Sequence, residues 1–427
     1  MISNYLPKGS FARNVLTLMT GTTLAQAIPI AVSPILTRLY SPSEFGVFAV
    51  YLAIVSVLAI LATGRYELAI MVPKKDRDAA ALVIIAFFLS ILVSLAILLI
   101  ILIFDEQIAR VLKISEYRYW LYWIPLSVVL TAGYQSLNYW SNRRGYYRRM
   151  SSARMAQSAA MSTVHVGAGY AGRGMLGLIM GAVVGQVVAF CLLLWSVRGK
   201  DKYSFRKLSG AKLLSVSRRY IDFPKFLVVA HSLNIASFQS PVMLLGSIFG
   251  TGAAGYFMLT QRVIGAPMSI VAGAIGDVFR QQASEAYSRT GSCREIYKKT
   301  FFRLLSVAII PFCMFFLVAP SFFALIFGEA WRVSGAYAQI LIPMFFVQFI
   351  TSPLSAMYMI AQRQKIDLLW QISLFSSVLI VFGIGYIFDS LILGLYLYSA
   401  AYTCMYAVNG FVSFKLSGGI QVRTTSV

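Results

Sequence analysis

Long uninterrupted runs of apolar residues dominate the pattern of hydrophobic and polar positions along this chain. Residues 79–104, for example, read AAALVIIAFFLSILVSLAILLIILIF and hold no charge. Such runs exceed the roughly 20 apolar residues that a helix needs to cross the hydrocarbon core of a bilayer. Because lipid offers backbone groups no hydrogen-bond partners, each run is expected to be a helix. The pattern therefore predicts an all-α protein that crosses a membrane many times.

The apolar runs and the breaks between them predict about twelve membrane spans. If the N-terminus is cytoplasmic, only six of the 37 Lys and Arg residues fall on the outer side and two lie within or at the edge of spans. This asymmetry satisfies the positive-inside rule, with both termini cytoplasmic. The first span has no small-residue cleavage site, so we expect it to be retained. The predicted spans cover approximately residues 12–37, 42–66, 79–103, 118–140, 150–170, 174–197, 220–246, 252–276, 301–327, 334–360, 368–388 and 391–414.

The spans divide into two halves of six. The densest basic stretch, RGKDKYSFRKLSGAKLLSVSRR at 198–219, follows the sixth span. The segment SPILTRLYSPSEFGVF (33–48) resembles SPVMLLGSIFGTGAAGYF (240–257) at the same place in the second half. Such matches, in the same order in both halves, favour a duplicated six-helix unit, an arrangement common in transporters. We therefore expect a first lobe at 1–197, a basic cytoplasmic linker at 198–219 and a second lobe at 220–427.

Composition supports a membrane protein and changes the meaning of the charge. The chain is 59% hydrophobic and 12% charged, with a mean hydropathy of +0.74, which is far outside the range of soluble domains. A net charge of +22 would suggest nucleic acid in a soluble protein. Here it follows mainly from topology, so no nucleic-acid partner is expected. Part of it is available to attract anionic lipid headgroups or phosphates to the inner face.

Residues for enzymatic chemistry are sparse. His165 and His231 lie in apolar spans, and neither is near a Cys, Asp or Glu at a ligand or triad spacing. The four cysteines are scattered, so we expect no disulfide, metal or other cofactor. GAGYAG at 167–172 matches the nucleotide motif G-x-G-x-x-G, but no strand precedes it and a tight reversal between spans is the better interpretation. No catalytic residue is predicted. A membrane glycan polymerase or ligase is a less favoured alternative, because the predicted outer loops are short.

Charged and polar groups inside the predicted spans are the candidates for function, because they are costly in lipid. Arg262 lies about ten residues beyond the outer start of its span, or roughly 15 Å deep, where it either locks helices together or attracts an anion. The first and seventh spans are polar and contain prolines. This predicts a central cavity bordered by both, with Gln26 and Asn234 as binding candidates. Asp222 and Asp277, near inner helix ends, are candidates for an ion or proton site, or simple interface residues.

The stretch GRYELAIMVPKK (64–75) places Arg65 and Glu67 after seventeen residues without charge. SPSE at 41–44 predicts a capping box that begins the second span. From there Arg65 lies roughly 35 Å along the helix axis, against a hydrocarbon core of about 30 Å, so we expect it at the inner mouth. Residues two apart on a helix do not face each other, so the partners of this Arg and Glu are expected elsewhere. Arg65 is either an interfacial anchor or a first contact for a lipid pyrophosphate, and Glu67 is a candidate for ion coupling.

The segment SPILTRLYSPSEFGVFAVYLAIVSVLAILATGRYELAIMVPKKDRDAAAL (33–82) resembles the opening of Wzx-type polysaccharide biosynthesis proteins. These are lipid-linked oligosaccharide flippases of the multidrug/oligosaccharidyl-lipid/polysaccharide (MOP) superfamily. The resemblance implies two six-helix lobes around a central cavity, as in MATE transporters, in the inner membrane of a bacterium. It also implies movement of an undecaprenyl-pyrophosphate-linked glycan to the outer leaflet by alternating access, for O-antigen, capsule or exopolysaccharide synthesis.

The resemblance also suggests site residues and partners. In relatives that flip cell-wall precursors, cations on first-lobe helices and on the eighth helix line the cavity, and by helix and depth Arg13, Arg65 and Arg262 match them. Guanidinium groups bind phosphate oxygens through paired hydrogen bonds and stay charged when dehydrated. Implied partners are the lipid-linked glycan, membrane lipids, and the polysaccharide polymerase and chain-length machinery, with the protein itself a monomer. The alternative within transport is a cation-coupled multidrug exporter, which would favour carboxylates in the cavity over arginines.

Overall fold

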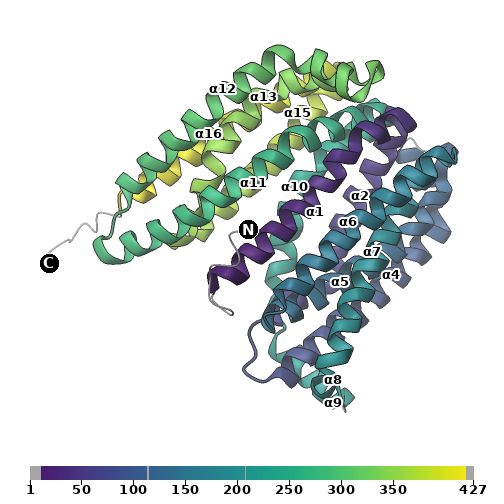
Figure 1. Cartoon of the computed structure of the whole chain (residues 1–427), viewed down its shortest axis with the longest axis vertical. Coiled ribbons are helices and arrows are strands. Elements are labelled where there is room, and N and C mark those ends of the chain that lie inside the picture. The colour runs from purple at the N-terminus through teal and green to yellow at the C-terminus, as the bar shows by residue number, and fades with distance from the viewer. Residues whose placement is uncertain (1–10, 113–114, 207, 420–427) are drawn as a thin grey trace. The chain divides into compact units, whose positions relative to one another are not determined.

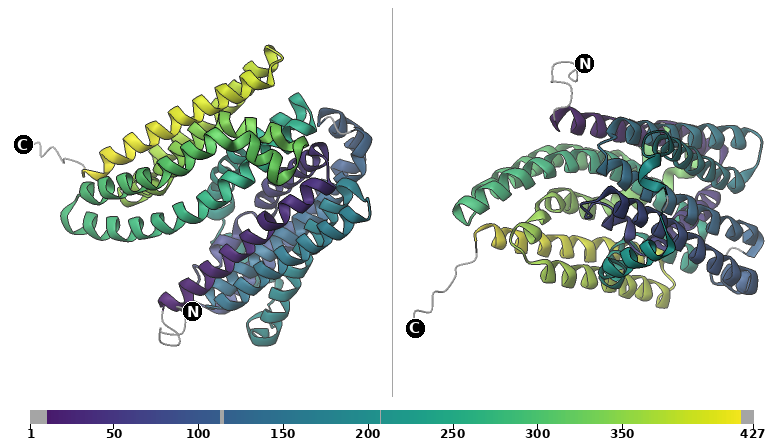
Figure 2. Two further views of the ribbon diagram at one scale, coloured as in Figure 1. Left: turned by 45° about the horizontal axis from the view of Figure 1, so that its top comes forward. Right: turned by 90° about the horizontal axis from the view of Figure 1, so that it is seen from below.

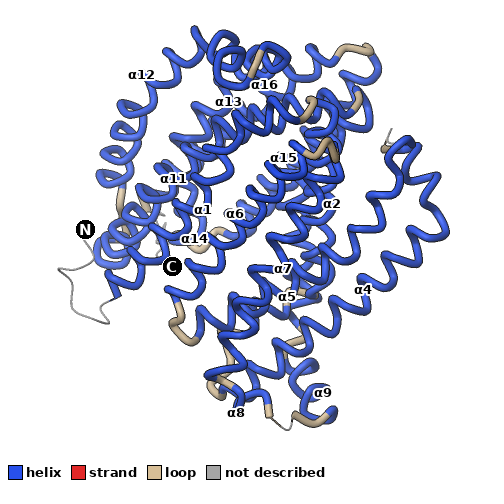
Figure 3. Tube along the Cα trace, turned by 45° about the vertical axis from the view of Figure 1, so that its right-hand side comes forward, coloured by secondary structure: helices blue, strands red, loops and turns tan. Residues whose placement is uncertain are grey.

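The computed structural model describes residues 11–112, 115–206 and 208–419, and it gives no side-chain surroundings for residues 11–19, 115–117, 200, 229 and 230. Throughout this described part the chain is helical and contains no strand (Figure 3). A helix fills each of the twelve predicted spans, which confirms the all-α fold. The chain forms two compact units, Met1–Gly255 and Tyr256–Val427. The seventh span therefore groups with the first unit, and the lobe boundaries stay a prediction.

The first unit contains the predicted spans one to seven and the basic segment between the sixth and seventh. Its elements are α1 (Phe11–Leu39), α2 (Pro42–Thr63), α3 (Tyr66–Ala69), α4 (Asp76–Val111), η2 (Ser115–Trp123), α5 (Ile124–Arg143), α6 (Tyr147–Tyr170), α7 (Gly174–Lys200), α8 (Lys202–Phe205), α9 (Gly210–Arg219), η3 (Phe223–Leu227), α10 (Val228–Leu244) and η4 (Leu245–Phe249). Helix α11 (Thr251–Thr290) begins at its edge.

The second unit contains the rest of α11 and the remaining spans. Its other elements are α12 (Arg294–Phe327), η5 (Glu329–Trp331), α13 (Arg332–Thr351), η6 (Ser352–Ala356), α14 (Met357–Ile360), α15 (Gln364–Ile387) and α16 (Leu391–Ser417). Helices α12, α13 and α16 pack side by side, and α15 packs against α16 (Figure 2). Tyr297 of α12 donates a hydrogen bond from its hydroxyl to the carbonyl oxygen of Gly410 in α16 at 2.8 Å.

Nine helical segments in the described part of the chain are long and apolar enough to cross a membrane. They include α2, α4, α7 and every long helix from α10 onward. Helices α1, α5 and α6 fill the other three predicted spans. The lengths follow from the sequence, since the 22 residues of α2 extend about 33 Å at 1.5 Å per residue, close to the thickness of a hydrocarbon core. The protein is a multi-pass membrane protein.

Small residues allow the polar helix α6 to pack inside the first unit between α1 and α7. A Cβ atom added to Gly181 would lie 2.1 Å from the His165 ring, and one added to Gly185 would lie 2.9 Å from the Gln157 carbonyl oxygen. The imidazole of His165 is hydrogen-bonded to the carbonyl oxygen of Leu178 at 2.7 Å. Gly181 and Gly185 of α7 therefore serve packing within the chain.

Two glycines from the resembling segments 33–48 and 240–257 meet where α2 and α11 begin. A Cβ atom on Gly46 would lie 1.6 Å from the Thr251 carbonyl oxygen, and one on Gly255 would lie 1.9 Å from the Pro42 carbonyl oxygen. No larger residue fits at either position without backbone movement. The pairing of corresponding glycines accounts for the Gly-Tyr-Phe and Gly-Val-Phe matches that the sequence displays at equivalent places.

An ion-pair network joins α4, α5 and the segment after α7 at the predicted cytoplasmic end of the first unit. Asp76 pairs with Arg143 at 3.0 Å and with Arg144 at 2.7 Å, and Arg144 also pairs with Asp201 at 3.2 Å. Asp78 pairs with Lys212 of α9. Helices α8 and α9 lie together at this end of the unit (Figure 1). The carboxylates at this end thus have basic partners, and several further cations remain without a carboxylate partner among the described residues.

Candidate functional site

A sharp corner of the chain follows α2, at the end that we predict to be cytoplasmic. The helix begins with the expected capping box, because Glu44 N donates to Ser41 Oγ while Ser41 N donates to Glu44 Oε2. It ends at Thr63, and Gly64 and Arg65 both adopt left-handed backbone conformations, with φ of 56° and 59°. A non-glycine residue pays about 1 kcal/mol for this conformation. The short helix α3 then starts at Tyr66.

The corner brings Arg65 and Glu67 into direct contact. Arg65 Nη1 donates to Glu67 Oε1 at 3.1 Å, with the Arg65 side chain 13% exposed and the Glu67 side chain fully buried. The expectation that these residues find their partners elsewhere is therefore wrong. It assumed a continuous helix through position 67, whereas the left-handed turn at Gly64 and Arg65 reverses the backbone and lets the two side chains meet.

The ion pair leaves hydrogen-bonding capacity unused in a buried place. Neither Arg65 Nε nor Glu67 Oε2 has a partner among the described residues. Tyr139 of α5 lies close enough to both charges to interact electrostatically, and His231 of α10 lies close to Arg65. Nδ1 of His231 is also buried without a partner in the described chain. An unmet buried polar group costs about 1–3 kcal/mol, so these atoms are suited to a polar ligand or water.

The backbone near these residues departs from regular α-helix on both sides of α10. Helix α10 is flanked by two π-helical turns, η3 and η4, and such turns occur frequently at functional sites. The Tyr66 hydroxyl donates to the Ser217 carbonyl oxygen of α9 at 3.1 Å. We name Arg65, Glu67, Tyr139 and His231 the α2-corner cluster.

The other predicted residues are not members of this cluster. Arg262 of α11 is half-buried and has neither an ion-pair nor a hydrogen-bond partner among the described residues. Asp277 is exposed, 3.9 Å from Arg280, and Asp222 is exposed immediately before η3. Gln26 is exposed on α1, and the half-buried Asn234 of α10 is engaged in an interaction. Arg13 lies in the first turn of α1, and its side-chain surroundings are outside the described part of the chain.

Sequence reasoning did not predict the polar interactions of three residues in the first unit. His231 and Tyr139 belong to the α2-corner cluster, although neither forms a motif with Arg65 or Glu67 in the sequence. Arg154 of α6 donates from Nη1 to Thr22 Oγ1 of α1 at 2.8 Å. An arginine four residues inside the predicted span 150–170 was the available signal for Arg154. Nothing in the local sequence around Tyr139 could have marked it.

Comparisons with known proteins place this arrangement in a family. Over 93% of both chains, the fold matches an inward-facing multidrug resistance MATE family transporter of the MOP superfamily, with a TM-score of 0.67 and 17% identity. It matches an outward-facing structure of such a transporter over 95% of this chain and 94% of the other, with a TM-score of 0.62 and 14% identity. These similarities establish the fold.

Sequence similarity leads to a polysaccharide family. The chain is 24% identical over 299 residues to the succinoglycan biosynthesis transport protein ExoT of Rhizobium meliloti (strain 1021). The match covers 70% of this chain and 58% of that relative, so this chain spans little more than half of the relative's length. The model of the family described as polysaccharide biosynthesis protein matches residues 35–336. The chain therefore belongs to the polysaccharide biosynthesis protein family, with the fold of the MOP-superfamily transporters.

Proposed function

We propose that this protein is a flippase of the bacterial inner membrane. It moves an undecaprenyl-pyrophosphate-linked oligosaccharide repeat unit from the inner to the outer leaflet by alternating access, for O-antigen, capsule or exopolysaccharide synthesis. The observation that carries the proposal is that two arginines, Arg65 and Arg262, have hydrogen-bond donors without partners among the described residues. Arg65 keeps Nε without a partner, and Arg262 has no partner among the described residues. A pyrophosphate offers the acceptor oxygens that such donors lack.

The two arginines suit successive steps of transport better than permanent binding. Arg65 lies just beyond the last residue of α2, where an arriving headgroup first meets the protein. It already shares its charge with Glu67, so a phosphate there competes with a carboxylate and is released more easily. Arg262 lies eleven residues after the start of α11, roughly 17 Å along its axis. In that interior position a charge interacts more strongly than in water.

The test is the location of the lipid-linked repeat unit in a strain that lacks the native gene and carries a variant. With Arg65→Ala or Arg262→Ala at normal membrane levels, we expect complete repeat units to accumulate on the inner leaflet and surface polysaccharide to fall at least tenfold. Arg289→Ala is the matched control, because it removes an arginine whose exposed side chain pairs with Glu285 on the surface of α11. Repeat units that reach the outer face and stay unpolymerised would instead indicate a polymerase or ligase and overturn the proposal.

One observation favours a second candidate, a cation-coupled multidrug exporter. Glu67 is fully buried and its Oε2 has no hydrogen-bond partner in the described chain, as a carboxylate that binds and releases a proton would be. A Glu67→Gln variant distinguishes the two functions. Under the flippase proposal it slows glycan export and leaves drug susceptibility unchanged, whereas an exporter would lose drug resistance and leave the polysaccharide intact.

A further inference from the structure

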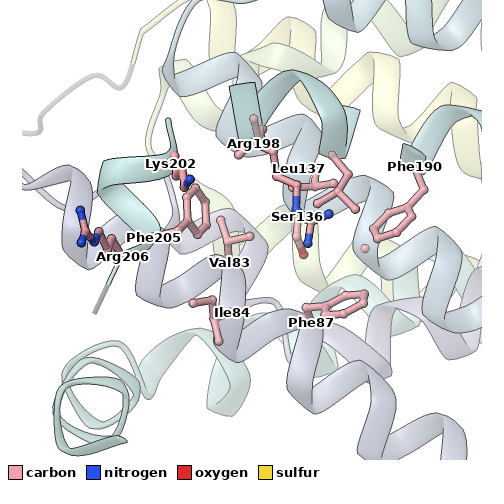
Figure 4. A pocket seen from close by; sticks show the side chains of 13 residues that line it. Val83, Ile84, Phe87, Ser136, Leu137, Phe190, Arg198, Lys202, Phe205 and Arg206 are labelled. Atoms are coloured by element: carbon pink, nitrogen blue, oxygen red, sulfur yellow. The ribbon is translucent and has the colours of Figure 1, made fainter. Parts of the chain in front are cut away.

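A groove separate from the α2-corner cluster runs between α4, α5, α7 and α8 of the first unit. Its volume is about 820 Å³, within the usual range of ligand sites of about 300–1,000 Å³. One end is lined by the aromatic rings of Phe87 and Phe190 (Figure 4). Lys202 and Arg206 lie toward the other end (Figure 4), and Arg198 completes a set of three cations in the lining. We call this site the basic groove.

The apolar end of the basic groove is shaped by a glycine and two stacked rings. The Phe87 and Phe190 rings have centroids 5.8 Å apart at an interplanar angle of 14°. A Cβ atom on Gly133 would lie 2.7 Å from the Phe190 ring and 3.0 Å from the Phe87 ring. The hydroxyl of Ser136 donates to the Ala132 carbonyl oxygen at 2.9 Å within its own helix. This part of the wall therefore suits a hydrocarbon chain, because its hydroxyl is already engaged.

The three cations of the lining are available to a ligand. Arg198, Lys202 and Arg206 are all exposed, and their charged groups make no ion pair or hydrogen bond with any described residue. The neighbouring carboxylates are already engaged, because Asp76 and Asp201 pair with arginines of the ion-pair network and Asp78 pairs with Lys212. The groove mouth thus carries three uncompensated positive charges within nine residues of chain.

Two exposed aromatic residues indicate where this end lies relative to a bilayer. Trp195 of α7 is 78% exposed, and Tyr203 of α8 is 81% exposed. Trp and Tyr are enriched at the level of lipid headgroups, and these two residues flank Arg198 and Lys202 in the sequence. The cations therefore lie at headgroup level. Phe190 precedes Arg198 on α7 by about 12 Å and lies within the acyl-chain region.

We propose that the basic groove binds an anionic glycerophospholipid of the cytoplasmic leaflet. One acyl chain lies along the apolar wall as far as Phe87 and Phe190, and the phosphate lies among Arg198, Lys202 and Arg206. The acyl chain leaves the apolar interior of the bilayer for the apolar wall of the groove, so its transfer gains little free energy. Selectivity between lipids therefore comes from the headgroup. Each cation near an anionic lipid is expected to raise its occupancy about fivefold. This site does not depend on which substrate the protein transports.

The test measures lipids retained by the purified full-length protein. Protein in detergent is mixed with equal amounts of phosphatidylglycerol and phosphatidylcholine of the same acyl chains, and bound lipid is counted by native mass spectrometry. We expect at least tenfold more phosphatidylglycerol than phosphatidylcholine on the unaltered protein. The triple variant Arg198→Ala/Lys202→Ala/Arg206→Ala should lose this preference. The control Lys74→Ala/Lys75→Ala/Arg148→Ala removes the same charge from exposed residues outside the groove and should keep it.

A second variant tests the apolar part without changing charge. Leu194→Trp fills the groove from its half-buried wall position and should reduce retention of long-chain phosphatidylglycerol at least fivefold. Three results would overturn the proposal. The first is equal retention of the two lipids. The second is displacement of bound phosphatidylglycerol by dihexanoyl phosphatidylglycerol or inorganic phosphate as effectively as by the long-chain lipid, and the third is its preferential displacement by undecaprenyl phosphate. The last would assign the groove to the polyprenyl carrier instead.

Discussion

The two units contain corresponding grooves that differ in their cations. A second groove, of about 530 Å³, lies between α12, α13 and α16. A shift of 217 residues, which separates the first residues of α7 and α16, relates three pairs of lining residues, namely Phe190 and Ala407, Leu194 and Phe411, and Val197 and Phe414. Lys298 is the one cation in its described lining, and it lies 3.9 Å from Glu295. Both units therefore have a groove between corresponding helices, whereas the set of cations, unpaired among the described residues, that suits a lipid headgroup is found in the groove of the first unit.

The same shift relates Arg198 to Lys415, and the contrast between them is physical. Arg198 is exposed without a partner among the described residues, whereas the Lys415 ammonium lies 4.5 Å from the centroid of the Phe411 ring. Arg294 is similarly placed 4.6 Å from the Phe414 ring. Aromatic faces attract cations, so the second unit holds Lys415 and Arg294 against two rings that also line its groove.

The two candidate arginines, Arg65 in the first unit and Arg262 in the second, show the opposite contrast. Arg65 in the first unit pairs with a fully buried carboxylate, and Arg262 in the second has no partner among the described residues. Loss of one member of a buried pair leaves an uncompensated charge, whereas loss of an unpaired arginine breaks no ion pair. The difference teaches that stability and transport should respond separately to substitutions in the two units.

The largest expected effect is on stability, from Glu67→Ala. The change leaves Arg65 without its charge partner in a place where its side chain is 13% exposed, and such a loss costs about 3–5 kcal/mol. Thermal unfolding in detergent should show a clear fall in Tm. Replacing both residues, as Arg65→Met/Glu67→Leu, should restore most of the stability. Glu285→Ala, which breaks an exposed pair, should cost under about 1 kcal/mol. An unchanged Tm in Glu67→Ala would mean that the Arg65–Glu67 pair forms only transiently.

Next in size is Arg262→Ala, which separates transport from stability. Because this side chain has no described partner to lose, the Tm should shift by no more than about 1 °C. Glycan export should fall roughly tenfold to a hundredfold, since one charged hydrogen-bonding group is worth about 1.5–3 kcal/mol. Arg262→Lys keeps the charge without the planar fork and should recover part of the export. A large fall in Tm would show that the arginine locks helices together.

These contrasts mark how far the sequence predicts the molecule. The spans and the capping box at Ser41 follow from local patterns, because hydropathy and capping residues act over a few residues. The Arg65–Glu67 pair was missed since one left-handed arginine after Gly64 reverses the geometry that a continuous helix implies. Tyr139 and His231 belong to the α2-corner cluster because α5 and α10 pack near the α2 corner. No local sequence pattern predicts this packing.

The sequence predicted the basic groove only in part. The density of cations at 198–219 indicated an attraction for anionic lipid headgroups or phosphates. Which cations remain available depends on the tertiary pairing of Asp76, Asp78 and Asp201 with other residues. The apolar wall that accompanies them comes from three separate helices.

A smaller effect is expected from Arg198→Ala alone. Removing one of three cations should reduce the preference for phosphatidylglycerol over phosphatidylcholine about fivefold, measured by native mass spectrometry on equal mixtures. Arg198→Lys keeps the charge and should retain most of the preference. Export should be unchanged by either variant, because Arg198 is exposed at the groove mouth. An unchanged lipid preference in Arg198→Ala would mean that Lys202 and Arg206 alone hold the headgroup.

The smallest effect is expected from Lys415→Ala, the corresponding substitution in the second unit. Its ammonium lies over the Phe411 ring, and Lys415 is not part of the groove lining, so the lipid preference should change less than twofold. A cation over an exposed aromatic ring contributes only about 0.5–1 kcal/mol, so Tm should also change little. The decisive comparison is Lys415→Ala with Phe411→Leu. If the ring restrains the lysine, Phe411→Leu should free the ammonium and raise phosphatidylglycerol retention, while the double variant should not. Equal lipid losses from Arg198→Ala and Lys415→Ala would show instead that both units bind anionic lipid alike.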